Sequence, residues 1–367
     1  MLELILGIVF LIYILFIGQL IYGCNRMKRF SRKEFTPKTS FTIVVPFRNE
    51  KENLPNLLHS ISLLNYPKEL VEIILVDDDS EEVFSVQDLV FSMKVIKNER
   101  KSNSPKKDAI ETAIQVAKND WIITTDADCL VQKNWLTTFN QYIQENEVEM
   151  VASGVCYVPK SGFLSAFQNL DFLSLQGATI GSFGIDQPFM CNGANFSYSK
   201  HFFKELNGFQ GNETIASGDD VFLLQKAVSV APKKVGFLLA KESIVATKPV
   251  ATWSELFQQR VRWASKSTGY SSVYGKLLAL VVFGGNLAWI VSFLLWLVGL
   301  LDQNIFMLFV ALKFLIDFIL IYKTASFFES KLQYVLASSL LYPFFSVSVA
   351  MYSLFGKYNW KGRNFRK

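Results

Sequence analysis

The chain has 367 residues, of which 50% are hydrophobic and 19% charged, with a formal net charge of +5. A wholly soluble protein of this size usually carries more charge, so the composition favours a soluble domain combined with membrane spans. The basic residues gather beside apolar segments, which fits anionic lipid headgroups and cytosolic retention better than nucleic acid. The 4 Cys have neither zinc nor disulfide spacing, and the 2 His lie far apart in sequence, so we expect free thiols and no histidine metal site.

The first apolar segment, residues 1–24, is predicted to be a transmembrane anchor. It is about 20 residues long, which is the length that a bilayer needs. It lacks the basic start and the cleavage site of a signal peptide. The positive charges of Arg26, Lys28 and Arg29 follow it. This order predicts an N-terminus outside and the next domain in the cytosol.

Residues 38–250 are predicted to form a cytosolic α/β domain. Apolar runs predict strands at 41–46, 71–76, 93–96 and 121–125, and helical periodicity predicts helices at 53–64 and 106–117. Strands that alternate with helices indicate a parallel sheet covered on both faces. Ligands bind beyond the carboxyl ends of such strands, where the acids at 77–79 and 126–128 would lie.

Two later stretches, 163–175 and 252–267, mix apolar with polar residues. Each is either an interfacial helix, with its apolar side toward lipid, or an amphipathic helix packed on the core, and the sequence leaves both open. We assign residues 251–275, which include the second stretch, to an interfacial helix.

A C-terminal transmembrane region is predicted at 276–356, followed by a basic tail at 357–367. Its apolar stretches, 277–301, 305–328 and 332–355, are each long enough to span a bilayer. Lys313 and Asp317 are four residues apart on one helix face and are expected to pair. One span before the domain and three after it would put the basic tail outside, against the positive-inside tendency. The sequence leaves open whether one stretch is interfacial or re-entrant, or whether the tail breaks the tendency.

Asp126 and Asp128 follow the fourth predicted strand and are candidate metal ligands. A nucleotide-sugar diphosphate needs its charge neutralised, and carboxylates can hold a divalent cation for that purpose. The alternative is an ordinary acidic turn in solvent, because an Asp-x-Asp triplet alone is weak evidence.

Two further acidic clusters are candidates for binding and catalysis. Asp77 to Asp79 end the second strand, where a carboxylate can accept hydrogen bonds from a uracil imide or a ribose; an acidic turn is the alternative. Asp219 and Asp220 precede an apolar helical run, so one can act as a general base on the acceptor hydroxyl. Helix capping is the alternative for this pair.

Gln259, Arg262 and Trp263 lie close together on a predicted helix. Arg262 can neutralise a diphosphate, and Trp263 offers a flat apolar face for a sugar ring. A membrane-surface helix with interfacial Arg and Trp is the alternative for this segment.

These motifs together resemble the membrane-bound inverting glycosyltransferases of family 2, which include cellulose, chitin, hyaluronan and poly-N-acetylglucosamine synthases and ceramide glucosyltransferase. The resemblance covers residues 41–270. The motifs in chain order are Phe41 to Glu50, Val76 to Ser80, Lys106 to Ala109, Thr125 to Asp128, Cys191 to Asn195, Gly218 to Asp220 and Gln259 to Trp263. Asp79 and Pro105 stand where the family usually has glycine, and Asp219 where it has glutamate. The segment Trp360 to Arg363 also resembles a short motif of lipid-modifying members.

The resemblance implies a GT-A fold, a mainly parallel mixed sheet flanked by helices, with N- and C-terminal transmembrane helices. It implies a UDP-sugar donor and Mg or Mn held by Asp126 and Asp128. It assigns the donor site, the catalytic groups and the acceptor side as follows: Pro46, Arg48, Glu50, Asp78, Lys106 and Asp126 bind the donor; Asp220, as the base, acts with Asp219, Gln259, Arg262 and Trp263; Asn192, Gly193, Ala194 and Asn195 line the acceptor side.

The sequence therefore predicts an enzyme that transfers a sugar, with inversion, from a UDP-sugar to a lipid or lipid-linked acceptor. We expect a multi-pass protein of the cell inner (plasma) membrane with a cytosolic catalytic domain and no nucleic-acid partner. The alternatives are a processive polysaccharide synthase of the same family, with a growing glycan as acceptor, and a non-catalytic membrane subunit that binds nucleotide-sugar. A transporter is suggested only by Lys313 and Asp317, and it would leave the ordered acids unexplained.

Overall fold

The computed structural model describes residues 1–33, 36–82, 91–213, 215, 217–355, 358–360 and 363–365. The chain divides into two compact units. The sheet unit comprises Lys28–Val158 and Met190–Lys248, and the helical unit comprises Met1–Met27, Pro159–Phe189 and Pro249–Lys367.

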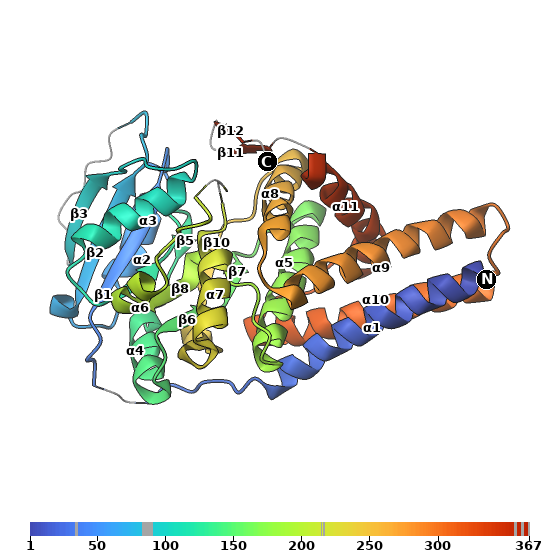
Figure 1. Cartoon of the computed structure of the whole chain (residues 1–367), viewed down its shortest axis with the longest axis horizontal. Helices are drawn as coiled ribbons and strands as arrows, with labels where there is room; N and C mark the ends of the chain where they lie inside the picture. Colours follow the sequence, from blue (N-terminus) through green and yellow to red (C-terminus); the bar gives the residue numbers. More distant parts are fainter. Residues whose placement is uncertain are drawn as a thin grey trace. The chain divides into compact units, whose positions relative to one another are not determined.

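The sheet unit is built on a seven-stranded mixed sheet with the strand order β3-β2-β1-β4-β8-β6-β9. Figure 1 shows β3, β2 and β1 side by side at one end of this order. Strands β3, β2, β1 and β4 run parallel to one another, whereas β8 is antiparallel to both β4 and β6. The strand bounds are β1 Phe41–Phe47, β2 Val71–Asp77, β3 Ser92–Lys97, β4 Trp121–Thr124, β6 Met150–Ser153, β8 Phe196–Ser199 and β9 Val235–Leu238. The four strands predicted from apolar runs are thus confirmed, with ends shifted by at most one residue.

Strand β1 shows why these residues form the centre of a parallel sheet. Its side chains are almost all buried, as expected for a strand covered on both faces. Pro46 lies opposite Val76 of β2, while the pairing of β1 with β4 ends at Val44 and Thr124. The hydrogen-bonded pairing of β1 with β4 therefore ends before Pro46, which has no N–H group to donate. The carboxyl ends of β1, β2 and β4 share one edge of the sheet.

Helices and a smaller sheet complete this unit. The predicted helices at 53–64 and 106–117 are present as α2 and α3. The helices are α2 Leu54–Ser62, α3 Pro105–Val116, α4 Trp135–Asn146, α6 Lys200–Glu205 and α7 Asp219–Val230. The smaller sheet has the order β5-β10-β7, with β5 Cys129–Leu130, β7 Val155–Tyr157 and β10 Val245–Thr247.

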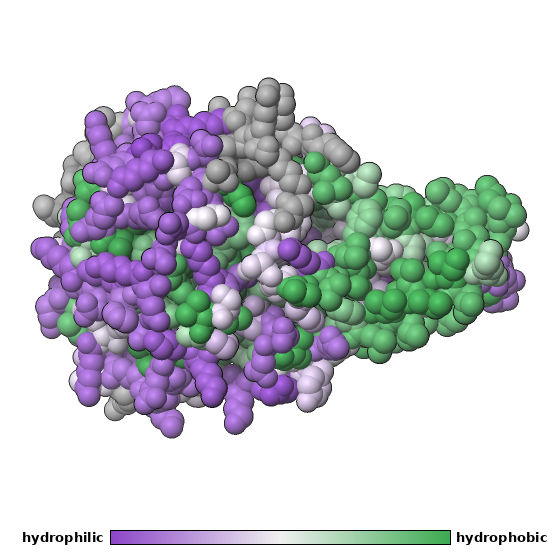
Figure 2. All heavy atoms as spheres, viewed as in Figure 1, coloured by the Kyte–Doolittle hydropathy of each residue, from purple (hydrophilic) through white to green (hydrophobic). Residues whose placement is uncertain are grey.

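Among its described residues, the helical unit contains four helices that are long and apolar enough to cross a membrane: Leu2–Arg26, Val273–Leu297, Gln303–Phe328 and Val335–Leu354. Their outward side chains are hydrophobic, and Figure 2 shows these residues as a continuous apolar surface. The bounds in this unit are α1 Leu2–Arg26, α5 Phe163–Gly184, α8 Trp253–Ala264, α9 Val273–Leu297, α10 Gln303–Phe328, α11 Val335–Phe355, β11 Tyr358–Trp360 and β12 Arg363–Phe365. Of the predicted basic tail at 357–367, residues 357, 361–362 and 366–367 lie outside the described residues.

The predicted stretch at 163–175 is the first half of α5, a longer helix that packs in the helical unit. Most of its side chains are buried, which favours a packed helix over an interfacial one. Glycines allow its main chain to approach that of α1 closely. A Cβ on Gly181 would come to 2.4 Å from the carbonyl oxygen of Leu20, and one on Gly184 to 1.9 Å from that of Gly23. Residues 159–189, which the sequence placed inside the 38–250 domain, therefore belong to the helical unit.

Lys313 and Asp317 of α10 form the expected pair. The Lys313 Nζ lies 2.7 Å from Asp317 Oδ2, and the Tyr13 hydroxyl of α1 donates to Asp317 Oδ1 at 2.6 Å. The ammonium also lies 5.1 Å from the centre of the Tyr13 ring. Both carboxylate oxygens are thus satisfied inside the unit, which is the condition for burying such a pair among apolar helices.

Candidate active site

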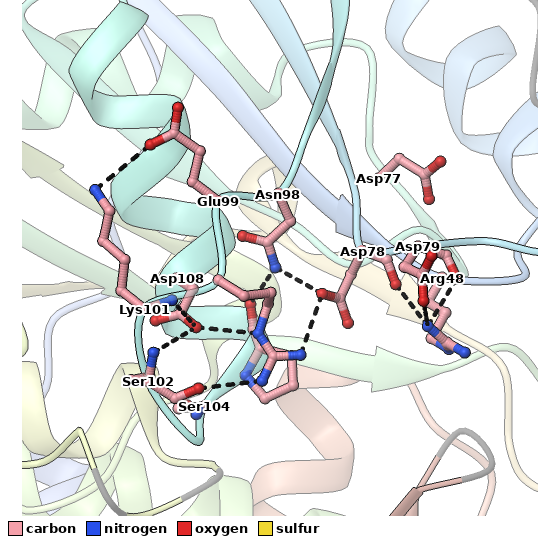
Figure 3. Close-up of polar contacts among 12 residues, drawn as sticks. Arg48, Asp77, Asp78, Asp79, Asn98, Glu99, Lys101, Ser102, Ser104 and Asp108 are labelled. Atoms are coloured by element: carbon pink, nitrogen blue, oxygen red, sulfur yellow. Dashed lines mark hydrogen bonds and ion pairs between the residues drawn. The ribbon is translucent and has the colours of Figure 1, made fainter.

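Arg48 joins the two turns that follow β1 and β2 (Figure 3). Its Nη1 donates to the main-chain oxygens of Asp78 at 2.8 Å and Asp79 at 2.7 Å, and it lies 3.3 Å from the Asp79 carboxylate. Asp79 has a φ of 64°, in the left-handed region that favours glycine but that aspartate adopts more readily than most residues. Asp79 therefore adopts the turn conformation expected of the glycine that it replaces.

Asp78 is buried at the end of β2 and is held by the loop that follows β3. Asn98 Nδ2 donates to its Oδ1 at 2.7 Å and to the Pro105 carbonyl at 3.0 Å, and Arg100 Nη1 lies 3.7 Å from the same Oδ1 (Figure 3). Arg100 is also paired with Asp108, at 3.1 Å. The carboxylate predicted to face the nucleotide base thus has a fixed position.

Lys106, in the first turn of α3, brings two of the predicted acidic clusters together. Its Nζ lies 2.6 Å from Asp126 Oδ1 and 3.5 Å from Asp219 Oδ2. Burial by itself disfavours the charged form, but the carboxylates of Asp126, Asp219 and Asp220 outweigh it and raise the pKa of Lys106 above its ordinary value. Lys106, Asp126, Asp219 and Asp220 are called the acidic centre below.

Asp220 lies at the start of α7 and is held by main-chain donors. The N–H of Gly193 donates to its Oδ2 at 2.9 Å, and that of Val221 donates to its Oδ1 at 2.7 Å. A Cβ on Gly193 would come to 2.8 Å from Asp219 Oδ2 and 3.4 Å from Lys106 Nζ. Glycine at 193 is therefore what lets this loop approach the acidic centre.

The predicted acceptor-side residues 192–195 form a single turn whose polar groups are largely used within the unit. The Asn192 side chain caps the turn by accepting from the N–H of Ala194. The amide of Asn195 is fully buried; it accepts from the Trp135 indole at 2.9 Å and donates to the carbonyls of Gly154 and Ser243. Asn195 thus holds the turn in place, and Gly193 is the member that contacts the acidic centre.

Asp126 and Asp128 end β4 on the same edge. The Asp126 side chain is 40% exposed, whereas Asp128 accepts from Thr247 Oγ1 at 3.3 Å. Within the described residues, no group of three or more His, Cys, Asp or Glu side chains is placed to hold a metal ion. The two carboxylates fit a divalent cation only as part of an oxygen ligand set that water or a bound diphosphate completes.

The other predicted donor residues lie at the start of the unit. Pro46 lies in β1 beside β2. The Glu50 carboxylate accepts from Asn53 Nδ2 at 2.5 Å, and its carbonyl accepts from the N–H groups of Asn53 and Leu54 where α2 begins. Glu50 thus organises the start of α2.

Gln259, Arg262 and Trp263 lie on α8 of the helical unit. Thr252 and Glu255 form a capping box that begins this helix. Arg260, between the predicted residues, is buried; it pairs with Asp171 of α5, donates to Gln259, and lies 4.3 Å from the centre of the Trp263 ring. Arg260 therefore holds the side chains of Gln259 and Trp263 in position.

Sequence reasoning missed the residues that hold the predicted ones in place. These are Asn98, Arg100 and Asp108 in the sheet unit and Arg260 and Asp171 in the helical unit. Arg260 stands within the segment Gln259 to Trp263, which was a signal for it, and Asp108 likewise stands within Lys106 to Ala109. The other partners lie outside the predicted motifs.

Comparisons with known proteins show what the chain is similar to. Residues 42–206 match the model of Glycosyl transferase family 2. The mannosyltransferase PcManGT from Pyrobaculum calidifontis, solved with GDP-Man and Mn2+, aligns with a TM-score of 0.54 and 13% identity, over 96% of this chain and 99% of that one. The sheet and this likeness define a GT-A fold with flanking candidate membrane helices.

Two curated relatives are also glycosyltransferases. GlyG of Streptococcus pneumoniae is 31% identical over 117 residues, which is 30% of this chain and 37% of that protein. AglE of Haloferax volcanii is 21% identical over 228 residues, which is 60% of this chain and 70% of that protein. The match to GlyG thus covers little more than a third of its length.

Proposed function

We propose that this protein is an inverting, metal-dependent glycosyltransferase that moves a sugar from a UDP-sugar to a lipid or lipid-linked acceptor at the cytosolic face of the membrane. The observation that carries the proposal is the acidic centre, where Lys106 lies within ion-pair distance of both Asp126 and Asp219. The Lys106 ammonium thus links Asp126, at the end of a strand where the donor diphosphate would bind, to α7, the helix that carries the proposed base.

The donor would bind at the carboxyl edge of β1, β2 and β4, as ligands do in sheets of this kind. Asp78 is positioned by Asn98 and Arg100 and would accept hydrogen bonds from the uracil imide or the ribose. Arg48, which fixes the turn that carries Asp78, supports this site. A carboxylate held in one position favours a nucleotide base that presents an N–H donor to it. A base without that donor would leave a polar group of the site without a hydrogen bond, which costs binding energy.

Asp220 would act as the general base. As the acceptor hydroxyl oxygen forms its bond to C1 of the sugar, a carboxylate oxygen of Asp220 takes the hydroxyl proton, and the bond from C1 to the phosphate oxygen breaks. A single displacement of this kind inverts the configuration at C1. The N–H groups of Gly193 and Val221 donate to the two carboxylate oxygens and fix the orientation of the carboxylate.

Negative charge develops on the departing diphosphate, and the chain supplies cations for it. Lys106 is the cation in the sheet unit, and the motif predicts the same role for Arg262, with Gln259 beside it and Trp263 packing against the acceptor. Asp126 and Asp128 would hold Mg or Mn, which when bound neutralises diphosphate charge. PcManGT was solved with Mn2+ and a nucleotide sugar, which supports this choice.

The acceptor class rests on the helical unit. Four helices that are long and apolar enough to span a bilayer belong to the same chain as the glycosyltransferase domain. An enzyme held in a membrane meets lipid-borne hydroxyl groups at high local concentration, which favours a lipid or lipid-linked acceptor over a soluble one.

The test is a screen of the purified full-length chain with native lipids against UDP-sugars, with GDP-mannose as a further donor, read by mass spectrometry. We expect one UDP-sugar to yield a product that extracts into organic solvent, and Asp220→Asn to abolish it. A long water-soluble polymer would replace the lipid acceptor with a growing glycan. No turnover with any donor would overturn the enzymatic proposal and favour a non-catalytic subunit.

A further inference from the structure

We propose that Lys106 and the divalent cation compete for Asp126, so that the cation binds together with the donor diphosphate and not before it. This inference rests on the proposed function and adds an order of binding to it. In this role the Lys106 ammonium occupies Asp126 and weakens the binding of a metal ion that arrives without a diphosphate.

The contacts of Lys106 carry the first step. Its Nζ lies 2.6 Å from Asp126 Oδ1, which is the short distance of a charge-assisted hydrogen bond. The Lys106 side chain is 17% exposed, whereas that of Asp126 is 40% exposed. A cation from solvent therefore reaches a carboxylate that already has an ammonium partner.

The chemistry of the cation supplies the second step. Mg²⁺ binds carboxylate oxygens at about 2.0–2.1 Å and retains several waters, so it needs further anionic ligands to bind tightly. An ammonium ion on the same carboxylate repels a second positive charge. In the part of the chain that the structure describes, no third acidic, cysteine or histidine side chain completes a metal site with Asp126 and Asp128. A bare cation therefore meets both an incomplete ligand set and a competing positive charge.

A bound diphosphate changes both conditions. Its oxygens would complete the ligand set, and its charge would give the ammonium of Lys106 an anionic partner in place of Asp126. Lys106 also has Asp219 within reach, at 3.5 Å from its Nζ, so releasing Asp126 does not leave the ammonium unpaired. The same movement would draw Lys106 toward the helix that carries the proposed base, so that donor loading and base positioning are linked.

The experiment measures Mn²⁺ binding by electron paramagnetic resonance on the full-length protein in detergent, with and without UDP. For the unmodified protein we expect weak Mn²⁺ binding alone, and binding at least about tenfold tighter with UDP. Lys106→Met should tighten binding without UDP by about tenfold and shrink the UDP effect. Lys107→Met is the matched control, because the ammonium of Lys107 donates to the main-chain carbonyls of Asn212 and Ile215. It should leave Mn²⁺ affinity within about twofold.

Lys106→Arg keeps the positive charge and should keep the weak binding, and Lys106→Gln gives a second neutral variant if the methionine variant does not fold. Unchanged or weaker Mn²⁺ binding in the folded neutral variants would overturn the inference, as would the absence of Mn²⁺ binding by the unmodified protein with UDP. If sugar transfer is intact in either of these cases, the inference fails while the proposed glycosyltransferase function stands. Absent transfer with every donor instead refutes the function, whatever the Mn²⁺ result.

Discussion

Two lysines, the partly buried Lys106 and the buried Lys313, show how differently this chain uses one side chain in its two units. Lys106 lies among Asp126, Asp219 and Asp220, with one carboxylate at 2.6 Å and another at 3.5 Å. Lys313 is paired with a single carboxylate, Asp317, whose second oxygen accepts from a tyrosine hydroxyl. The first cluster has more acids than lysines, and the second is balanced.

This difference in charge balance distinguishes the acidic centre, a proposed binding site, from the Lys313–Asp317 pair, a packing interaction. A balanced pair with both oxygens satisfied needs no ligand, and its role is to let two polar side chains lie within apolar helices. Three carboxylates lie around the one ammonium of Lys106, and Asp126 among them is partly exposed, which suits the proposed site for a diphosphate and its cation. The predictions below test this contrast.

The largest expected effect is that of Asp220→Asn on sugar transfer. Removing the proposed general base should lower kcat by about 10³-fold, because general-base catalysis contributes about 10²–10⁴-fold. Initial rates with the donor found in the screen give this value. Asp120→Asn, at an exposed aspartate, is the control and should keep the normal rate. Full turnover by Asp220→Asn would show that another group takes the proton.

In the helical unit, Lys313→Met should destabilise the protein by about 3–5 kcal/mol, because it removes the ion-pair partner of Asp317 among apolar helices. Thermal unfolding in detergent measures this loss. The double variant Lys313→Met with Asp317→Leu should regain most of it, and its transfer rate should match the unmodified protein. If the double variant is stable but inactive, the Lys313–Asp317 pair has a role in sugar transfer, and the contrast between the two lysines is wrong.

An added methyl group at Gly193 tests the close approach in the acidic centre. Its Cβ would lie 2.8 Å from Asp219 Oδ2 and 3.3 Å from Asp220 Cβ. Gly193→Ala should therefore lower kcat by about 10–100-fold, since small displacements of catalytic groups have effects of this size. Gly284→Ala in α9 meets nothing within 4 Å and should leave the rate unchanged. Equal rates for both variants would contradict the geometry.

The smallest effect concerns Glu72, a buried acid in β2 that lies outside the acidic centre. Burial raises its pKa, but donors from the Lys118 N–H, Lys94 and Thr42 outweigh burial and hold the pKa below its ordinary 4.5. Its stabilising contribution is thus full above about pH 4.5 and is lost as pH falls through the lowered pKa. Glu72→Gln should lose about 1–3 kcal/mol at pH 7. The difference in melting temperature from the unmodified protein should narrow at pH 4, and a difference that stays constant would refute this assignment.

The sequence predicted the strands of the sheet because their apolar runs reflect burial on both faces. It also predicted which edge carries the acids, since the motifs follow β2 and β4 directly. The pairing of Lys313 with Asp317 followed from helical spacing alone, and the structure confirms it. Local pattern was sufficient in each of these cases.

Partners far apart in sequence were not predictable in the same way. Arg260 pairs with Asp171 across 89 positions, and Tyr13 contacts Asp317 across 304. Periodicity and motifs carry no information on such pairs, because they depend on which helices pack together. The same reason explains why Asn98 and Arg100 were missed as partners of Asp78. The roles of Gln259, Arg262 and Trp263 toward a substrate stay predictions from the motif.

The most direct test of the central claim is an experimental structure of the full-length chain with UDP and Mn²⁺, in which the metal is located by its anomalous signal. The account predicts the metal on Asp126 and Asp128, the uracil beside Asp78, and the Lys106 ammonium moved from Asp126 toward the diphosphate or Asp219. A nucleotide and metal bound elsewhere, with Lys106 still on Asp126, would contradict it.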